Sequence, residues 1–327
     1  MKFLGIDGGG TKTEFLVIDD LGKILAHTTM PTCHYMQTSL DNFQNVIRKG
    51  INTVCNQMDI SISDIDYTFV GIPGYGEIKK DIEILDSIIE DILLSQNYKC
   101  GNDSVVAWAG SLACQSGINI VAGTGAIGFG VDGKGNTARA SGWGHFCGDE
   151  GSAYWLGKKV IQLFTKQSDG RMEKTPLYDI VREELNIQEN FELLDFVINH
   201  LEMKRDEIAQ LAKLLYKAAE ADDKRAIEVY SRAAYEHYLT INAITNKLDF
   251  DIRDKVLVSY SGGVFNAGEY VLEPLEAYLI ENKLNAELIE PILMPVTGAA
   301  LYALDICLGG IQEDIIEKLK VEEKSIL

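Results

Sequence analysis

The 327-residue sequence is poor in positive charge: 30 lysines and arginines stand against 49 aspartates and glutamates, a formal net charge of −19. A surface this acidic repels nucleic acid backbones and anionic lipid, so neither is an expected partner. No apolar run approaches the length that spans a bilayer, and Asp7 comes too early for a signal peptide. We therefore expect a cytoplasmic protein whose acidity mainly aids solubility.

Cysteine is also scarce. The six cysteines form no Cys-x-x-Cys pair and no Cys/His cluster, which indicates reduced thiols rather than a disulfide framework or a zinc site. No low-complexity segment and no flexible Pro/Ser linker is present. Because the chain is longer than a single hydrophobic core usually allows, we expect two lobes joined by ordered crossings.

Strand and helix patterns alternate along the chain. Three short strands separated by a Gly-rich turn and a second polar turn predict an antiparallel meander at the start. The expected strands are 2–6, 14–19, 23–28, 67–72 and 255–260. The expected helices are 41–58, 78–94, 104–114, 151–165, 205–220, 223–247 and a tail at about 297–323, where Gly298-Ala299-Ala300 permits close packing.

Residues 120–135 repeat the pattern of residues 4–23, namely a strand, a Gly/Thr turn, a second strand and a polar turn with Gly and Lys. One interpretation is that all β-hairpins need glycine and therefore look alike. The shared Gly-Thr chemistry at corresponding turns favours the other interpretation, a structural unit used twice. The sequence thus predicts an α/β fold of two related lobes that face each other.

The first repeat carries Asp7, three glycines, Thr11, Lys12 and Thr13. Consecutive glycines let the backbone adopt conformations that other residues resist, and their bare N–H groups can cradle phosphate oxygens. The threonines add hydroxyls, and Asp7 at a strand end can hold Mg²⁺ through water. The turn matches neither a Walker loop nor a Rossmann fingerprint, and the alternative is a plain hairpin turn.

Residues 122–126 (Ala-Gly-Thr-Gly-Ala) form the matching turn of the second repeat. Two such turns from opposite lobes can hold a polyphosphate from both sides. Between them, Asp103 begins a predicted helix. Two compatible roles are open to it: an N-cap for the free N–H groups of that helix, or a general base for a hydroxyl during phosphoryl transfer.

The order of Asp7–Thr13, a lone Asp103, residues 122–130 and the Gly-Gly turn at 261–268 resembles the ATPase superfamily that includes actin and hexokinase. Residues 141–155 (SGWGHFCGDEGSAYW) resemble, more narrowly, the sugar-site segment of the N-acetylglucosamine kinases in the BadF/BadG/BcrA/BcrD ATPase family. The resemblance implies two ribonuclease H-like (actin-like ATPase) lobes with a central cleft.

The implied lobes are residues 1–116, completed by a C-terminal helix at 297–327, and residues 117–296 with a helical insert. The resemblance is weak across 165–250. It implies ATP and Mg²⁺ as cofactors and a small amino sugar as the phosphoryl acceptor. Relatives of this kind are often dimers, so a homodimer is one expected assembly.

The resemblance also assigns roles to individual residues. Asp103 is the implied catalytic base, and Asp7 is the implied Mg²⁺ site, through water. The implied nucleotide contacts are Gly9, Gly10, Thr11, Lys12, Thr124, Gly125, Ala209, Gly262 and Gly263. The implied sugar contacts are His34, Tyr35, Asp103, Gly142, Trp143, Gly144, Asp149 and, as a weaker candidate, Glu150.

Asp149 can accept hydrogen bonds from sugar hydroxyls and Trp143 can offer an apolar face, although core packing is the alternative for Trp143 and His145. Cys33 stands where the family has an asparagine before its His-aromatic pair, and a thiol is a far weaker hydrogen-bonding partner. The first expectation is N-acetylglucosamine phosphorylated on its 6-hydroxyl. N-acetylmuramic acid and a sugar without the N-acetyl group stay open.

Two other functions stay open. An activator ATPase of the same family would hold an iron–sulfur cluster through cysteines of a Gly-Cys-Gly loop, to which only Cys147 comes close. A non-catalytic sugar sensor would keep the fold without turnover. We expect no DNA-binding helix-turn-helix, because none precedes Phe3, and the presence of both Asp7 and Asp103 favours an enzyme.

Overall fold

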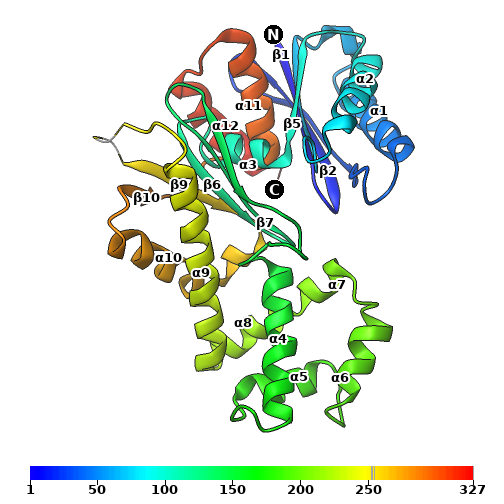
Figure 1. Cartoon of the computed structure of the whole chain (residues 1–327). Helices are drawn as coiled ribbons and strands as arrows, with labels where there is room; N and C mark the ends of the chain where they lie inside the picture. Colours follow the sequence, from blue (N-terminus) through cyan, green and yellow to red (C-terminus); the bar gives the residue numbers. More distant parts are fainter. Residues whose placement is uncertain (252, 254, 327) are drawn as a thin grey trace. The chain divides into compact units, whose positions relative to one another are not determined.

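The computed structural model describes residues 1–251, 253 and 255–326. Residues 252, 254 and 327, which fall inside the predicted lobes, lie outside the described residues. The chain divides into two compact units: unit 1 is Met1–Asn119 with Glu290–Leu327, and unit 2 is Ile120–Ile289. Each unit contains a five-stranded sheet with helices packed against it (Figure 1).

The sheet of unit 1 has the strand order β3-β2-β1-β4-β5. Strands β1 to β3 pair antiparallel, so the predicted meander is confirmed, whereas β1, β4 and β5 run parallel. The carboxyl ends of these three parallel strands therefore lie at one edge of the sheet. The strands are β1 (Lys2–Gly8), β2 (Lys12–Asp19), β3 (Ile24–Pro31), β4 (Tyr67–Ile72) and β5 (Tyr98–Asn102).

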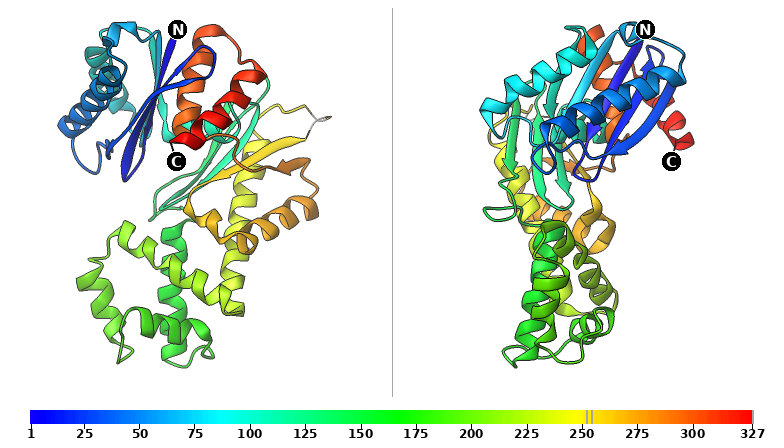
Figure 2. Two further views of the ribbon diagram at one scale, coloured as in Figure 1. Left: turned by 180° about the vertical axis from the view of Figure 1, so that it is seen from behind. Right: turned by 90° about the vertical axis from the view of Figure 1, so that its right-hand side faces the viewer.

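Helices cover both faces of this sheet. One face carries α1 (Leu40–Gln57) and α2 (Ile82–Leu93), and the other carries α3 (Asp103–Ser111), α11 (Pro295–Leu308) and α12 (Glu313–Glu322). Figure 2 shows the same two layers from behind. The alternation along the strands explains this arrangement, because Leu4 and Ile6 of β1 belong to one buried core cluster and Phe3 to the other.

Close backbone approach holds α11 against β1 and α3. A Cβ on Gly5 would lie 2.1 Å from the Ala300 nitrogen, and one on Gly298 would lie 2.0 Å from the Gly110 nitrogen. Glycine is required at both contacts because any side chain would overlap the neighbouring backbone. The prediction that the small residues at 298–300 permit close packing is confirmed.

Unit 2 repeats the topology of unit 1. Its strand order, β10-β9-β6-β7-β8, corresponds strand by strand to β5-β4-β1-β2-β3. A Gly/Thr turn joins the first two strands in each unit, so the duplication predicted from the sequence is confirmed. The strands are β6 (Gly117–Ala122), β7 (Ala126–Val131), β8 (Thr137–Ser141), β9 (Val256–Ser261) and β10 (Ala286–Leu288).

Most helices of unit 2 lie between β8 and β9 in the chain and form the predicted helical insert (Figure 1). They are α4 (Ala153–Ser168), α5 (Pro176–Glu184), α6 (Glu192–Asp195), α7 (Arg205–Gln210), α8 (Ala212–Glu220) and α9 (Lys224–Thr245). After β9, a short 3₁₀ turn (Gly263–Ala267) leads into α10 (Glu269–Glu281).

The predicted helices differ from the observed ones in several bounds, and at three places the helix is also divided or preceded by a turn. Helix α2 begins at Ile82 rather than at 78, because a 3₁₀ turn (Lys79–Asp81) precedes it. The segment expected as one helix at 205–220 is divided into α7 and α8. The tail expected at about 297–323 is two helices, since Gly309 takes a φ of 74° and ends α11.

Candidate functional site

The turn between β1 and β2 presents an exposed tip of Gly10, Thr11 and Lys12. The Gly9 nitrogen donates to the Lys12 carbonyl at 2.8 Å and closes the turn. None of the glycines at 8–10 has a positive φ, so the expectation that they supply unusual backbone conformations is wrong. Their contribution is steric: small residues leave the backbone N–H groups of the tip open to a ligand.

Glycine is needed at position 8 because a side chain there would overlap the side chain of Cys33. A Cβ on Gly8 would lie 2.7 Å from the Cys33 Sγ. The hydroxyl of Thr13 donates to the Pro31 carbonyl at 3.0 Å and accepts from the Cys33 nitrogen at 2.9 Å. Thr13 is fully buried, so the expectation that its hydroxyl faces phosphate is wrong. It fixes the segment after β3 instead.

Asp7 near the end of β1 and Asp103 after the end of β5 come to the same sheet edge. Asp7 pairs in register with Gly71 of β4, and Gly71 pairs with Gly101 of β5. Burial, and then the negative charges of Asp103 and Glu14, raise the pKa of Asp7 to about 7, while Lys12 opposes the shift. The two aspartates therefore share one negative field at this edge.

The N-cap of α3 is Asn102, whose side chain accepts from the Ser104 nitrogen at 3.1 Å. Asp103 is the first residue of the helix, so the N-cap role predicted for it belongs to the preceding residue. The Asp103 carboxylate is half-buried and also accepts from the Ser104 nitrogen at 3.1 Å. Because Asn102 supplies the cap, the role that stays predicted for Asp103 is that of a general base.

The segment after β3 carries Cys33, His34 and Tyr35. Cys33 is fully buried, and burial raises the pKa of its thiol to about 11, so it is protonated. Tyr35 is buried too, and its hydroxyl donates to Asp81 at 3.2 Å. His34 is half-buried, and its carbonyl accepts from the nitrogens of two following residues. The sugar contacts expected from His34 and Tyr35 stay predictions.

In unit 2, the turn between β6 and β7 lies at the centre of several contacts. The Gly123 nitrogen donates to the Gly125 carbonyl at 2.9 Å, and the Gly123 carbonyl accepts from Ala153 at 2.8 Å, where α4 begins. Gly262 has a φ of 99°, and a Cβ there would lie 2.5 Å from the Ala122 carbonyl oxygen. The structure thus brings the predicted phosphate turn and the predicted adenosine turn of unit 2 into contact.

The tips of these two turns are accessible. Thr124, Gly262 and Gly263 are exposed, whereas Ala209 is buried on α7. Ala209 lies one helical turn after Arg205, on the same face of α7. The nucleotide contacts predicted in unit 2 stay predictions. Ala209 is buried, unlike the exposed Thr124, Gly262 and Gly263.

An ion pair that the sequence reasoning missed joins α7 to the same turn. The Arg205 Nη2 lies 2.6 Å from the Asp149 Oδ2, and the Asp149 side chain is 3% exposed. A Cβ on Gly125 would lie 2.2 Å from that guanidinium and 2.9 Å from the Asp149 carboxylate. The predicted sugar ligand Asp149 and the predicted phosphate turn are thus connected through Arg205. No local motif marks Arg205, which lies where the family resemblance was weak.

The segment that follows β8 has an unusual backbone. Positive φ angles occur at Ser141, Gly142, Gly144, Asp149 and Gly151. Trp143 is 78% exposed, and His145 and Glu150 are exposed as well, so core packing is excluded for Trp143 and His145. At Ser141 and Asp149, which are not glycines, this conformation costs free energy, and such strain is concentrated at binding sites. The exposed indole is available to a ligand, as the sugar-site prediction requires.

His237 of α9 is buried beneath this segment. It is 1% exposed, and a Cβ on Gly151 would lie 2.6 Å from its ring. Burial lowers the pKa of His237 to about 4, although a hydrogen bond with the Gly151 backbone opposes the shift. The unfolded chain, with the ordinary pKa of 6.5, therefore binds the proton more readily than the folded chain. The contribution of His237 to stability is present above pH 6.5 and is lost as the pH falls toward 4.

We expect the free energy of unfolding of the wild type to fall between pH 7 and pH 5 by about 2 kcal/mol more than that of His237→Gln. Glutamine keeps a polar side chain at this position but does not titrate. Urea unfolding at both pH values measures the difference. His200→Gln is the control for the substitution itself, because it makes the same change at a histidine that is 67% exposed rather than buried. An equal pH dependence of the wild type and His237→Gln would contradict a buried neutral imidazole.

The described residues hold no helix that is long and apolar enough to cross a membrane. They also hold no group of three or more His, Cys, Asp or Glu side chains that could bind a metal ion. All six cysteines are free thiols, and Cys147, the nearest approach to an iron–sulfur ligand, is exposed.

Comparison with known proteins gives several full-length relatives. The N-acetyl-D-glucosamine kinase of Dictyostelium discoideum is 30% identical over 311 residues, which cover 93% of this chain and 98% of the relative. The N-acetylmuramic acid/N-acetylglucosamine kinase of Clostridium acetobutylicum is 28% identical over 312 residues, which cover 94% and 100% of the two chains.

Solved structures share the fold. A hexokinase of the ROK group from Thermus thermophilus aligns with a TM-score of 0.61 at 16% identity, over 95% of this chain and 100% of its own. A candidate N-acetylglucosamine kinase from Chromobacterium violaceum aligns with a TM-score of 0.68 at 23% identity, over 93% and 98%. The predicted fold class, two lobes of the actin and hexokinase type, is confirmed. The family model of the BadF/BadG/BcrA/BcrD ATPases matches residues 4–303, and the chain belongs to that family.

Proposed function

We propose that this chain is an ATP-dependent kinase that phosphorylates an N-acetylated amino sugar, with N-acetylglucosamine and its 6-hydroxyl as the first choice and N-acetylmuramic acid as the second. The observation that carries the proposal is the contact of Asp149 and Arg205 with Gly125. It places a buried carboxylate suited to sugar hydroxyls beside a turn suited to phosphate. The relatives from Dictyostelium and Clostridium, which are named as kinases of these sugars, support it.

Asp103 is the proposed base for the attacking hydroxyl. Phosphoryl transfer needs mainly positioning and charge stabilisation, so a single carboxylate that orients the hydroxyl and accepts its proton is sufficient. Asp103 shares the sheet edge of Asp7, as the electrostatic effect on the pKa of Asp7 indicates. Asp103 would then act beside the residue proposed for the metal.

The donors at this edge fit Mg²⁺. The ion prefers oxygen ligands and usually keeps several waters, with one or two protein carboxylates and the substrate phosphates. Asp7 would hold it, and a cation would oppose both causes of the raised pKa of Asp7, which are burial first and then repulsion by Asp103 and Glu14. When bound, Mg²⁺ would neutralise negative charge on the transferring phosphoryl group.

The proposed nucleotide contacts come from both units. Unit 1 contributes the exposed tip with Gly9, Gly10, Thr11 and Lys12, although Lys12 also pairs with Glu14 at 2.6 Å. Unit 2 contributes Thr124, Gly125, Ala209, Gly262 and Gly263. For the sugar, Gly142, Trp143, Gly144, Asp149 and the weaker candidate Glu150 come from unit 2, and His34 and Tyr35 from unit 1.

The buried thiol of Cys33 bears on the choice of sugar. Because Cys33 is protonated and packs against Gly8, it offers a ligand no strong hydrogen bond. Recognition of the acetamido group would then rest on other residues, which is why N-acetylmuramic acid stays within the proposal. The free cysteines favour a reducing compartment such as the cytoplasm, and a homodimer is the assembly that the family resemblance implies.

An ATP-consumption assay with Mg²⁺ tests the proposal. The panel is N-acetylglucosamine, N-acetylmuramic acid, glucosamine, N-acetylmannosamine and glucose, with a control without sugar. We expect strong turnover with an N-acetylated amino sugar and little in its absence. Hydrolysis of ATP at one rate with every sugar and without sugar would refute the kinase and favour an activator ATPase.

A further inference from the structure

A groove between α4 and α9 of unit 2 gathers positive charge in a chain whose net charge is −19. Its volume is about 150 Å³. Lys159 and Lys166 line it from α4, and Arg225 and Arg232 line it from α9. Members of each pair are seven residues apart, so they lie on one face of their helix, two turns from each other. Cations thus border the groove along both helices.

The floor of the groove is apolar. Leu163 and Val229 lie halfway along the two helix faces, and both are buried. Met172, which follows α4, lines the same space, and its nitrogen donates to the Lys166 carbonyl at 3.0 Å. If the four cations were only solvent-exposed surface charges, no apolar hollow between them would be expected. An apolar floor under a rim of cations instead suits a ligand with a carbon skeleton and an anionic group.

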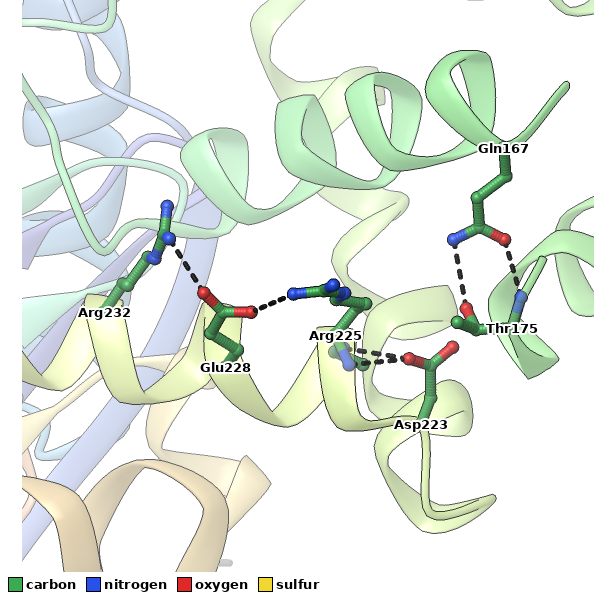
Figure 3. A network of polar contacts seen from close by, with 7 residues as sticks. Gln167, Thr175, Asp223, Arg225, Glu228 and Arg232 are labelled. Carbon is green, nitrogen blue, oxygen red and sulfur yellow. Dashed lines mark hydrogen bonds and ion pairs between the residues drawn. The ribbon is translucent and has the colours of Figure 1, made fainter. Parts of the chain in front are cut away.

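Glu228 holds the two arginines in place. It accepts from Arg225 at 3.0 Å and from Arg232 at 2.8 Å, and Figure 3 shows it between them on α9. The hydrogen bond from Arg225, followed by the charge of Arg232, lowers the pKa of Glu228, so it is ionised. One carboxylate cannot neutralise both guanidiniums and both lysines. Each guanidinium has five N–H donors, of which these bonds use a fraction.

The positive charge that Glu228 does not neutralise affects the pKa of a groove lysine, Lys159. Burial, and then the positive charges of Arg232, Lys158 and Lys166, lower the pKa of Lys159, and Glu236 opposes this only partly. The Lys159 ammonium group also lies 4.7 Å from the centre of the Trp155 ring, a distance typical of a cation–π contact. Crowding of like charges is unfavourable, and an anion bound among them would relieve it.

We propose that this groove binds a phosphate group carried by a small molecule, with Lys159, Lys166, Arg225 and Arg232 as its contacts and Leu163 and Val229 beneath the carbon skeleton. Guanidinium forks match phosphate oxygens, and lysines add point charge. The site is separate from the predicted phosphate turn, which α4 meets at Ala153. Lys159 and Lys166 lie six and thirteen residues further along α4, which correspond to rises of about 9 Å and about 20 Å. The inference does not depend on the proposed kinase activity.

The test is an NMR titration of protein labelled with ¹³C at the methionine methyl groups, because Met172 lines the groove. The Met172 signal is assigned by its loss in Met172→Leu. The probes are inorganic phosphate and glucose 6-phosphate, with chloride at equal ionic strength as the control. We expect phosphate-bearing probes to shift this signal saturably and chloride not to. A tighter dissociation constant for glucose 6-phosphate assigns the site to a phosphate ester, and equal constants assign it to phosphate alone.

Variants locate the binding. Lys166→Gln and Arg225→Gln should each raise the dissociation constant of the phosphate-bearing probes, measured at the Met172 signal, by about tenfold, because each removes a charged contact. Lys213→Gln is the control, since it removes the same charge from an exposed position of α8 that does not line the groove, and it should change nothing. Both pocket variants replace exposed side chains, and unshifted signals of the other methionines verify folding. The proposal would be overturned if phosphate shifted the Met172 signal linearly and by no more than chloride does. It would also be overturned if the dissociation constants for phosphate were the same in the wild type and in all variants.

Discussion

Asp103→Asn is expected to lower the turnover number of the sugar-dependent reaction by about 10²- to 10⁴-fold, the usual contribution of a positioned general base. Asparagine keeps the size of the side chain and an oxygen that accepts hydrogen bonds, but it takes no proton from the attacking hydroxyl. The dissociation constants for sugar and nucleotide should therefore change little. A coupled assay of ADP release gives the turnover number, and calorimetry gives the two dissociation constants.

Asp305→Asn is the control for this experiment. Asp305 is another partly buried aspartate of unit 1, on α11, and it belongs to no part of the proposed site. Its replacement should leave both turnover and binding near the wild-type values. Near-full activity of Asp103→Asn would refute its assignment as the base. Loss of sugar binding in step with loss of activity would leave Asp103 as a sugar contact, which is its other predicted role, but not as the base.

The features predictable from the sequence are those that local patterns encode. Apolar alternation and the Gly/Thr turns revealed the three-stranded meander, and their recurrence at 120–135 revealed the duplicated sheet order. The register of β1, β4 and β5 then brings Asp7 and the residues before Asp103 to one edge without further information. The small residues at 298–300 were informative because close packing leaves a compositional trace, whereas the contact of Gly5 with Ala300 became known only from the structure.

Other features depend on contacts between distant segments and were not predictable. Thr13 resembles a phosphate ligand in sequence, yet its hydroxyl is used by Pro31 and Cys33, which only the pairing of β2 with β3 brings near. Asn102 rather than Asp103 caps α3, a shift of one residue that either side chain could have supported. Arg205 meets Asp149 across 56 residues, and no short pattern encodes such a contact.

That contact supports the second large prediction, which concerns stability. Arg205→Gln leaves the Asp149 carboxylate, 3% exposed, without its charged partner. Removing one member of a buried ion pair typically costs about 3–5 kcal/mol, because the remaining charge is buried and uncompensated. Because the Arg205 side chain is 35% exposed, solvent screens the pair in part, and we expect a smaller loss of about 2–3 kcal/mol in urea unfolding of Arg205→Gln. Asp149→Asn, which leaves no buried carboxylate, should cost less.

A double-mutant cycle separates the interaction energy of the Arg205–Asp149 pair from the effects of losing each side chain by itself. In Arg205→Gln with Asp149→Asn no charge is left buried, so the double variant should recover part of the stability lost in Arg205→Gln, with an interaction energy of about 1–3 kcal/mol. The control cycle uses Lys217 and Glu184, a pair of the same unit at 2.6 Å whose side chains are 49% and 40% exposed. Solvent screens such a pair, which should couple by less than about 1 kcal/mol. If the Arg205–Asp149 coupling is no larger than that of the exposed pair, Arg205 does not hold the Asp149 carboxylate against the turn at Gly125.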